Sequence, residues 1–215
     1  MKQKVLLTGF DPFGGESLNP SWEAVKQLHG EVIDDVALVA EQIPTVFGKS
    51  VAVLEHLIQK HDPDIVICVG QAGGRQHITP ERVAINMNDA RIPDNQGNQP
   101  IDEPIVDNGP VGYWSTIPIK RMVENMKESN IPASVSHTAG TFVCNHIFYR
   151  LMDHITRTKS DIRGGFIHIP FILEQTIHKE APSLSLATIV KGIKIAAVTA
   201  AKYESDIHTV GGTTH

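Results

Sequence analysis

The sequence predicts an α/β domain in which strands and helices alternate along the chain. Short apolar runs of strand length are separated by stretches whose apolar residues recur at helical spacing. The runs at 5–10 and 64–70 lack polar alternation, which is typical of strands covered on both faces of a sheet. Of the 215 residues, 41% are hydrophobic, which is enough for one sizeable core, so we expect one domain over residues 1–215.

The first third of the chain is expected to hold three strands and two helices. The strands are predicted at residues 5–10, 36–43 and 64–70. A Gly/Pro-rich loop follows the first strand, and Asn19 is then a suitable N-cap with Pro20 at the first helical position. This helix stops at Gly30. The second helix is predicted to begin at Thr45 and to end by Pro63, because the apolar residues between them form a helical stripe.

Residues 71–114 interrupt this alternation. They are rich in Gly, Pro, Asn and Asp and contain one strand-like stretch, at 82–87. Irregular segments of this length are usually functional or disordered. We therefore expect a lid or a wall of an active site here.

The alternation resumes after this segment. Strands are predicted at residues 133–137 and 165–169. One helix is expected at 120–127, a second carries Cys144 and runs to about Lys159, and a third starts near Ser185 and spans Val198. The tail, at about 207–215, is expected to be flexible.

Composition excludes several classes of protein. The formal net charge is -5 and there is no basic stripe or zinc-finger spacing, so we expect no nucleic-acid partner. No segment approaches the roughly 20 apolar residues that span a bilayer, and no signal-peptide pattern is present, so we expect no membrane partner. The chain has 2 cysteines, and free thiols suit a reducing compartment, so the predicted location is cytoplasmic.

Cys144 is the strongest candidate for a catalytic residue. It lies between a short strand-like run and an amphipathic helix. The N–H groups at a helix N-terminus are unpaired and the helix dipole is positive there, so both favour a thiolate. We therefore expect a thiol pKa below the ordinary value of about 8.5. The competing interpretation is a small apolar residue of the core.

A cysteine nucleophile needs a base and a group that orients the base. His146 is two residues from Cys144 on the same helix, so the two side chains point to different faces. His137 precedes the loop that leads to Cys144. His168 is better placed, near the carboxyl end of an apolar strand, where ligand sites of open α/β sheets lie. A lone histidine in such a strand is, however, more often a hydrogen-bonded core residue.

Other candidate groups are less constrained by position. For the orienting acid, spacing alone does not decide between Glu81, Asp89 and Asp94. Arg91 is a candidate for stabilising an oxyanion, and by default a surface arginine. Three phenylalanines at predicted strand-to-helix junctions suggest a flat apolar pocket, or else part of the core: Phe10, Phe13 and Phe142. Metal-binding spacings and nucleotide-binding glycine motifs are missing, so no metal and no cofactor are predicted.

Five blocks, in order, resemble the pyroglutamyl peptidase I family, also called pyrrolidone-carboxylate peptidases. They are residues 9–15, 69–75, 80–86, 139–145 and 166–170. The resemblance implies a cysteine peptidase that removes N-terminal pyroglutamate from peptides. It also implies a three-layer α/β/α sandwich around a twisted, mixed and mostly parallel sheet, and a cytoplasmic homotetramer.

The resemblance also assigns roles to residues. It places a catalytic triad on Glu81, Cys144 and His168, and oxyanion contacts on Arg91 and the Cys144 backbone N–H. The lactam pocket falls on Phe10, Phe13, Gln71, Phe142 and Val143. The alternatives are a different small-acyl cysteine amidohydrolase, a non-catalytic module that binds pyroglutamyl termini and, less favoured, a nucleoside-binding α/β protein.

Overall fold

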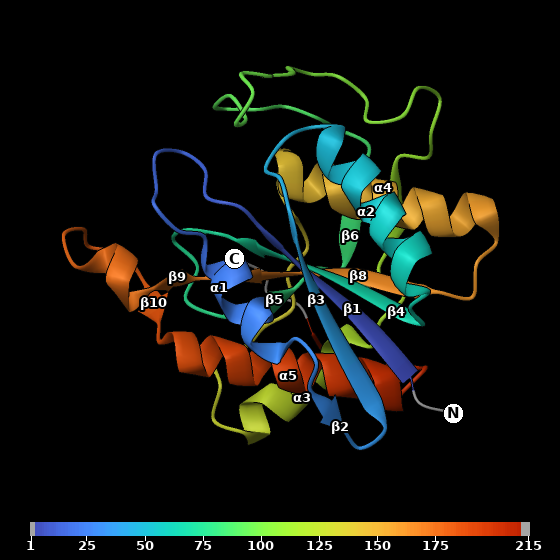
Figure 1. Ribbon diagram of the computed structural model, residues 1–215, viewed down its shortest axis with the longest axis vertical. Helices are drawn as coiled ribbons and strands as arrows, with labels where there is room; N and C mark the ends of the chain where they lie inside the picture. Colours follow the sequence, from blue (N-terminus) through green and yellow to red (C-terminus); the bar gives the residue numbers. More distant parts are fainter. Residues whose placement is uncertain (1–2, 212–215) are drawn as a thin grey trace.

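A six-stranded sheet forms the middle layer of the molecule (Figure 1). The computed structural model describes residues 3–211. The strand order is β2-β3-β1-β4-β8-β5. Four strands are parallel, namely β1 (Gln3–Phe10), β3 (Val36–Ile43), β4 (Ile65–Gln71) and β8 (Arg163–Ile169). At the two edges, β2 (Val32–Ile33) and β5 (Thr79–Pro80) pair antiparallel, so the sheet is mixed and mostly parallel, as predicted.

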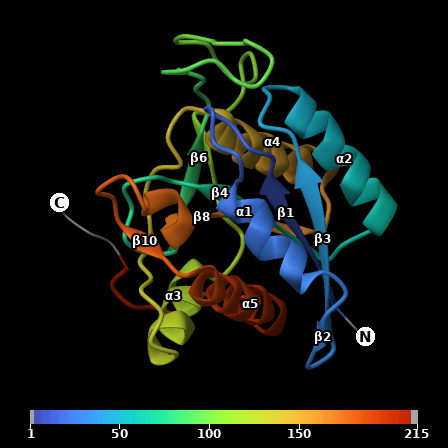
Figure 2. The same ribbon diagram turned by 60° about the vertical axis from the view of Figure 1, so that its left-hand side comes forward.

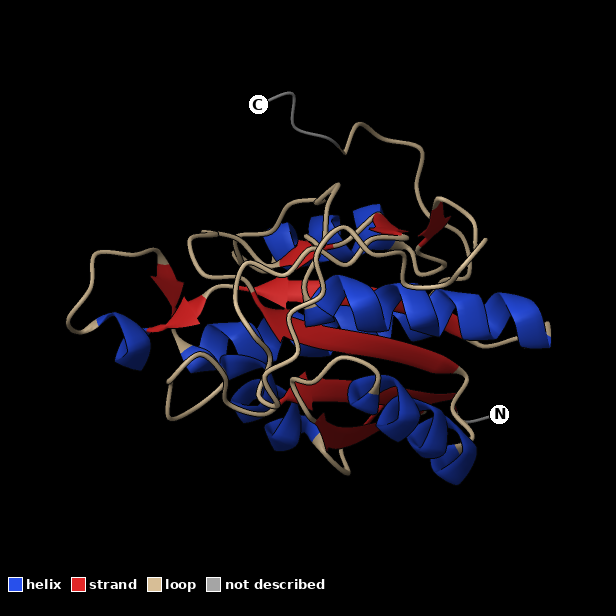
Figure 3. Cartoon of the chain, turned by 90° about the horizontal axis from the view of Figure 1, so that it is seen from above, coloured by secondary structure: helices blue, strands red, loops and turns tan. Residues whose placement is uncertain are grey.

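Helices cover both faces of this sheet (Figures 1 and 2). One face is covered by α1 (Pro20–Val25), α3 (Ile119–Glu128) and α5 (Leu186–Lys202), and the other by α2 (Lys49–His61) and α4 (Val143–Thr158). Along β1, Val5 and Leu7 pack into the first apolar cluster and Leu6 into the second. This alternation gives two cores on one sheet. The view from above shows the layers, and the predicted three-layer α/β/α sandwich is confirmed (Figure 3).

The predicted starts of two helices are confirmed by capping hydrogen bonds. The Asn19 side chain accepts the Ser21 N–H at 3.1 Å, and Pro20 is the first residue of α1. A 3-10 turn, η1 (Lys26–Leu28), completes that helix. Ser185 likewise caps α5 by accepting the Thr188 N–H at 3.1 Å. Both caps satisfy N–H groups that a helix leaves unpaired at its start.

Two predicted elements differ from the structure. The second helix begins at Lys49 rather than Thr45, because the Thr45 N–H and hydroxyl both donate to Asp11, at 2.6 and 3.1 Å, and hold a loop. The stretch 133–137 is not a continuous strand. It makes two isolated bridges, Ala133 with Ile78 and Ser136 with Glu81.

The predicted irregular segment, 71–114, is organised by side chains. It contains β5 and a small antiparallel sheet of β6 (Val83–Ile85) and β7 (Gly112–Trp114). The side-chain oxygen of Asn86, Oδ1, accepts the N–H groups of Ile105 and Val106 at 2.8 and 2.9 Å. The Asn145 amide of α4 bonds both the N–H and the C=O of Ile85. The segment is therefore anchored to α4 as a wall.

Two further features complete the chain. After β8, an arm made of β9 (Phe171–Ile172), η2 (Leu173–Thr176) and β10 (Ser183–Leu184) projects from the body (Figure 1).

After α5, Asp206 accepts the N–H groups of Lys120 and Arg121, each at 2.9 Å, and caps α3. Arg82 donates to the Gly211 carbonyl at 2.9 Å. Residues 207–211 of the predicted flexible tail are thus in contact with the body, and 212–215 lie outside the described residues. Within 3–211, none of the helices is long and apolar enough to cross a bilayer.

Candidate active site

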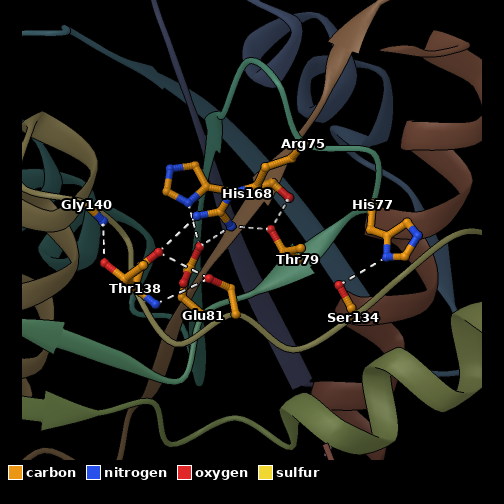
Figure 4. Close-up of polar contacts among 9 residues, drawn as sticks. Arg75, His77, Thr79, Glu81, Ser134, Thr138, Gly140 and His168 are labelled. Carbon is orange, nitrogen blue, oxygen red and sulfur yellow. Dashed lines mark hydrogen bonds and ion pairs between the residues drawn. The ribbon is translucent and has the colours of Figure 1, made fainter. Parts of the chain in front are cut away.

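Three of the predicted residues come from three different elements. His168 lies near the carboxyl end of β8, Glu81 directly follows β5, and Cys144 is the second residue of α4. The pairing of β5 with β8 sets Thr79 opposite His168, and the Glu81 N–H donates to the Phe166 carbonyl at 2.9 Å. This backbone register fixes both side chains, and His168 Nδ1 lies 2.7 Å from Glu81 Oε1 (Figure 4).

The contact between His168 and Glu81 fixes the tautomer of the imidazole. An ionised carboxylate only accepts hydrogen bonds, so the proton of a neutral imidazole sits on Nδ1. The lone pair is then on Nε2, where it is available to take a proton. Glu81 is completely buried and His168 is 3% exposed, so water does not compete with this contact.

The sulfur of Cys144 lies against β4 at Gly70. A Cβ atom placed on Gly70 would be 2.8 Å from Cys144 Sγ, closer than such atoms approach. Gly70 is also the register partner of His168 on the neighbouring strand. The missing side chain at Gly70 therefore makes room for the sulfur on the strand beside the histidine.

The electrostatics differ from the prediction at the thiol. Burial raises the pKa of Cys144 to about 12, the Glu81 carboxylate adds to the rise, and Arg75 opposes it. Burial also lowers the pKa of His168, although Glu81 opposes that shift. The predicted low thiol pKa is wrong here, because desolvation of the sulfur outweighs its place in the first turn of α4. The resting pair is a neutral thiol beside a neutral imidazole.

Glu81 stays ionised although it is buried. Burial alone would raise its pKa. The hydrogen bond from His168 and the charge of Arg75 lower the pKa by more than burial raises it, so the net shift is downward. One guanidinium N–H group of Arg75 meets Glu81 Oε1 at 2.6 Å. Sequence reasoning missed this arginine. One signal could have indicated it: a buried carboxylate requires a cation, and Arg75 is in the loop just before Glu81.

The start of α4 offers backbone donors. The N-cap residue, Phe142, makes no capping hydrogen bond through its side chain, and the first intrahelical bond runs from the His146 N–H to the Phe142 carbonyl at 3.0 Å. The N–H groups of Val143 and Cys144 thus have no acceptor within the helix. The Val143 side chain is fully buried in the core, so its predicted role in binding falls to its backbone.

Aromatic side chains gather next to this helix start. The rings of Phe13 and Phe142, both half-buried, have centroids 6.2 Å apart. Phe47, which the sequence analysis did not select, meets Phe142 edge-on at 5.4 Å. Phe10 is 2% exposed and packs against Phe166 at 6.4 Å, so it belongs to the core beneath the site.

Gln71 ends β4 with its side chain in a fixed orientation. The Ile172 N–H donates to Gln175 Oε1 at 3.2 Å, and Gln175 Nε2 donates to Gln71 Oε1 at 2.9 Å. A backbone N–H group can only donate, so this chain of contacts sets the orientation of both amides. The Gln71 NH₂ group is consequently the end that can donate to a ligand.

The other predicted candidates make no side-chain hydrogen bond to His168 or Glu81 within residues 3–211. Asp89 and His137 are exposed. Asp94 accepts backbone N–H groups of its own loop, including that of Gln96 at 2.8 Å. Arg91 is exposed and its oxyanion role stays a prediction. The described residues, 3–211, contain no cluster of three or more His, Cys, Asp or Glu side chains suited to a metal ion.

Comparison with known proteins gives a consistent picture. The family model described as pyroglutamyl peptidase matches residues 3–203. A pyrrolidone-carboxylate peptidase of Bacillus velezensis is 66% identical over 215 residues, which is 100% of both chains. A protein of the same name from Bacillus subtilis is 64% identical, also over 100% of both chains.

Solved structures agree with the relatives. The crystal structure of pyroglutamyl peptidase I from Bacillus amyloliquefaciens is 66% identical, with a TM-score of 0.97 over 98% of this chain and 100% of that chain. A mutant pyrrolidone carboxyl peptidase from Pyrococcus furiosus is 42% identical, with a TM-score of 0.90 over 93% of this chain and 99% of that chain.

Proposed function

The chain belongs to the pyroglutamyl peptidase family, and from that premise we propose that Cys144 is the nucleophile, His168 the base and Glu81 the group that orients the base. The protein is a cysteine-type hydrolase that removes N-terminal pyroglutamate from peptides. The observation that carries the residue assignment is the 2.7 Å contact between His168 and Glu81, next to the strand position where the Cys144 sulfur lies.

The attack begins from neutral groups. As Cys144 Sγ approaches the carbonyl carbon that follows the lactam ring, its proton passes to His168 Nε2. The imidazolium that forms is stabilised by Glu81, which also holds the ring in its orientation. His168 acts here as a general base during the attack, because the raised pKa of Cys144, about 12, leaves little thiolate beforehand.

The negative oxygen of the tetrahedral intermediate is assigned to the start of α4. The backbone N–H groups of Cys144 and Val143 point out of the first turn and the helix dipole is positive there. Arg91 is a second contact by resemblance. When the intermediate collapses, the C–N bond breaks, His168 donates its proton to the leaving amine, and a thioester remains on Cys144. Water then hydrolyses that thioester with His168 as base.

Recognition of the lactam is assigned to aromatic rings and an amide. The rings of Phe13 and Phe142 offer flat faces to the small ring. The NH₂ group of Gln71 is oriented to donate to the lactam C=O. A proline ring lacks that C=O, so it would leave the amide unpaired at a cost of about 1–3 kcal/mol.

One assay tests the reaction and the nucleophile together. The protein is incubated with a pyroglutamyl amide that carries a fluorescent leaving group, with the prolyl counterpart, and with a Cys144→Ser variant as control. We expect release from the pyroglutamyl amide by the wild type only. Equal release from both amides favours a different small-acyl amidohydrolase, and tight binding without release by folded, reduced protein favours a non-catalytic binding module.

We also propose a cytoplasmic homotetramer, following the resemblance. Its support is an arm that carries exposed apolar side chains, since Leu173 is 53% and Ile177 70% exposed. Apolar side chains on a projecting arm are suited to contact between subunits. Light scattering coupled to size exclusion gives the mass directly. A mass of one chain would contradict this proposal, and a charged residue in place of Ile177 should lower the mass if the arm is used.

A further inference from the structure

We propose that Arg75 is a positioning residue of the reaction, which holds Glu81 charged and in place for His168 and links both to the segment that carries Cys144. This inference rests on the proposed function, because it takes Glu81 to orient the base. Arg75 lies in the loop between β4 and β5 and its side chain is 26% exposed, whereas Glu81 is completely buried.

The guanidinium group meets three acceptors from two parts of the chain (Figure 4). One nitrogen donates to Glu81 Oε1 at 2.6 Å and to the Thr79 hydroxyl at 2.5 Å. The second nitrogen donates to the Thr138 carbonyl at 2.9 Å. A planar group with donors in a fixed fork suits this arrangement, and an ammonium group does not reproduce it.

The contacts at Glu81 make the arginine necessary rather than incidental. His168 Nδ1 and Arg75 meet the same oxygen, Oε1, at 2.7 and 2.6 Å. The other oxygen, Oε2, is buried and has no hydrogen-bond partner within residues 3–211. Without Arg75, the buried carboxylate would keep only His168 and a hydrogen bond from the Ser136 side chain, with no permanent positive charge beside it, and such a buried charge is costly.

The positive charge also affects the base. The charged groups that act on His168 are Glu81, from the end of β5, and Arg75, from the loop before it. The Cys144 thiol of α4 lies at Gly70, the register partner of His168. Glu81 favours a proton on the imidazole, and Arg75 disfavours it. Burial is the main cause of the lowered pKa of His168, and the charge of Arg75 adds to it against the opposing effect of Glu81.

The third contact reaches the nucleophile's side of the site. Thr138, whose carbonyl accepts from Arg75, holds the Gly140 N–H with its own hydroxyl at 3.1 Å. The chain then passes through Phe142 into α4 and Cys144. One side chain thus ties the carboxylate that orients the base to the turn from which the nucleophile's helix starts.

The test compares Arg75→Gln and Arg75→Lys with a control, Arg157→Gln. Arg157 also pairs with a nearly buried carboxylate, Asp153, at 3.0 Å, but near the C-terminal end of α4. For Arg75→Gln we expect kcat to fall about 10- to 100-fold, because the base loses its alignment. The acid limb of kcat/KM should move upward in pH, because His168 then holds its proton more tightly.

The conservative variant separates charge from geometry. Arg75→Lys retains the charge, so its acid limb should stay where it is in the wild type, while kcat falls several-fold because the fork to Thr138 is lost. If Arg75→Gln does not fold, this variant carries the test. Wild-type kcat in Arg75→Lys, or an acid limb displaced as far as in Arg75→Gln, overturns the proposal.

A double variant shows whether Arg75 acts through Glu81. In a Glu81→Gln background, adding Arg75→Gln should change kcat/KM little, because the two losses are not independent. Full additivity, or a lower Tm with wild-type kcat and pH profile, would leave Arg75 a merely structural residue and overturn the proposal. Full activity of Glu81→Gln alone would instead contradict the proposed triad.

Discussion

Two buried histidines occupy opposite situations in this molecule. His168, on β8, is 3% exposed, and His146, on α4, is 8% exposed. Burial lowers the pKa of each, in the case of His146 to about 4. Each Nδ1 also meets a side-chain oxygen, Glu81 Oε1 at 2.7 Å and Asn88 Oδ1 at 3.0 Å. By residue type, burial and first contact, the two are almost alike.

The difference lies in the charge of the partner and in the second nitrogen. His146 Nε2 accepts the Gly48 N–H at 3.3 Å, and Phe47 packs edge-on against the ring at 5.3 Å, so both nitrogens are occupied. The Nδ1 partner of His168 is a carboxylate, and its Nε2 is free of any such backbone bond within residues 3–211. A buried histidine becomes a base only where one nitrogen is open and its partner can balance a positive charge.

The largest expected effect comes from removing the Cys144 sulfur, the proposed nucleophile beside His168. Cys144→Ala should lower kcat by about 10⁴-fold or more, because no other group replaces the nucleophile. Cys68→Ala is the matched control, since Cys68 is fully buried in β4, and it should keep most of the activity. Steady-state kinetics on a pyroglutamyl amide measure both. Equal losses at the two cysteines would make Cys144 a structural residue.

The next effect compares the two histidines directly. Replacing each by Asn keeps a donor at the Nδ1 position and removes the nitrogen at Nε2. His168→Asn should lower kcat about 10²- to 10⁴-fold, the usual contribution of a general base. His146→Asn should leave kcat within about threefold, because its Nε2 serves only the Gly48 N–H. Similar losses of kcat in both variants would show that His168 has no role that His146 lacks.

Exchanging the partners of the histidines should give a smaller effect. Glu81→Gln keeps the size of the side chain but removes its charge, so kcat should fall about 10- to 10³-fold, less than on loss of the nucleophile. The reverse exchange, Asn88→Asp, places a carboxylate at His146 Nδ1 and should raise the pKa of His146, as followed by NMR, without a change in kcat. An unchanged rate in Glu81→Gln would redirect attention to Asp89 or Asp94.

The smallest expected effect is on the free energy of unfolding. Its pH dependence distinguishes the contribution of His146 from that of Glu81. The pKa of His146 falls from its ordinary value of 6.5 to about 4 on folding, so the folded protein favours the neutral ring. This contribution is fully present above pH 6.5 and is lost as the pH falls toward 4. It amounts to about 3 kcal/mol, at roughly 1.4 kcal/mol per pKa unit. The lowered pKa of Glu81 acts in the same direction, but only below its ordinary value of 4.5.

Urea unfolding at pH 7.5, 5.5 and 4.5 measures this contribution. Wild type and His146→Asn should lose stability differently between the first and last pH, with the variant less sensitive to acid. His168 titrates in both proteins, so the difference between them isolates His146. Parallel loss of stability in the two proteins would show that the neutral state of His146 does not matter.

The sequence was sufficient where local chemistry decides the outcome. Asn19 with Pro20 and Ser185 mark helix starts through caps that need no tertiary contact. The strand at 36–43 is predicted to the residue, because its apolar spacing and its boundaries are local. The triad was reached through blocks of family resemblance, whereas spacing alone left Glu81, Asp89 and Asp94 open.

The failures share a cause, which is that they depend on contacts across the fold. Thr45 resembles a helix start, but Asp11, 34 residues earlier, engages its N–H and hydroxyl. The place of Cys144 in its helix predicts a low thiol pKa, whereas burial of the sulfur and, after it, the Glu81 charge raise that pKa. The importance of Arg75 appears only once Glu81 is known to be buried.

Because the two thiols differ in exposure, the number of thiols that a reagent labels reports whether a chain is folded. Cys144 is half-buried, whereas Cys68 is completely buried in β4. Under native conditions a thiol reagent should add one label per folded chain, and two after unfolding. The ratio of the two mass shifts then reports the fraction of correctly folded molecules in any preparation, without a substrate and without a reference sample.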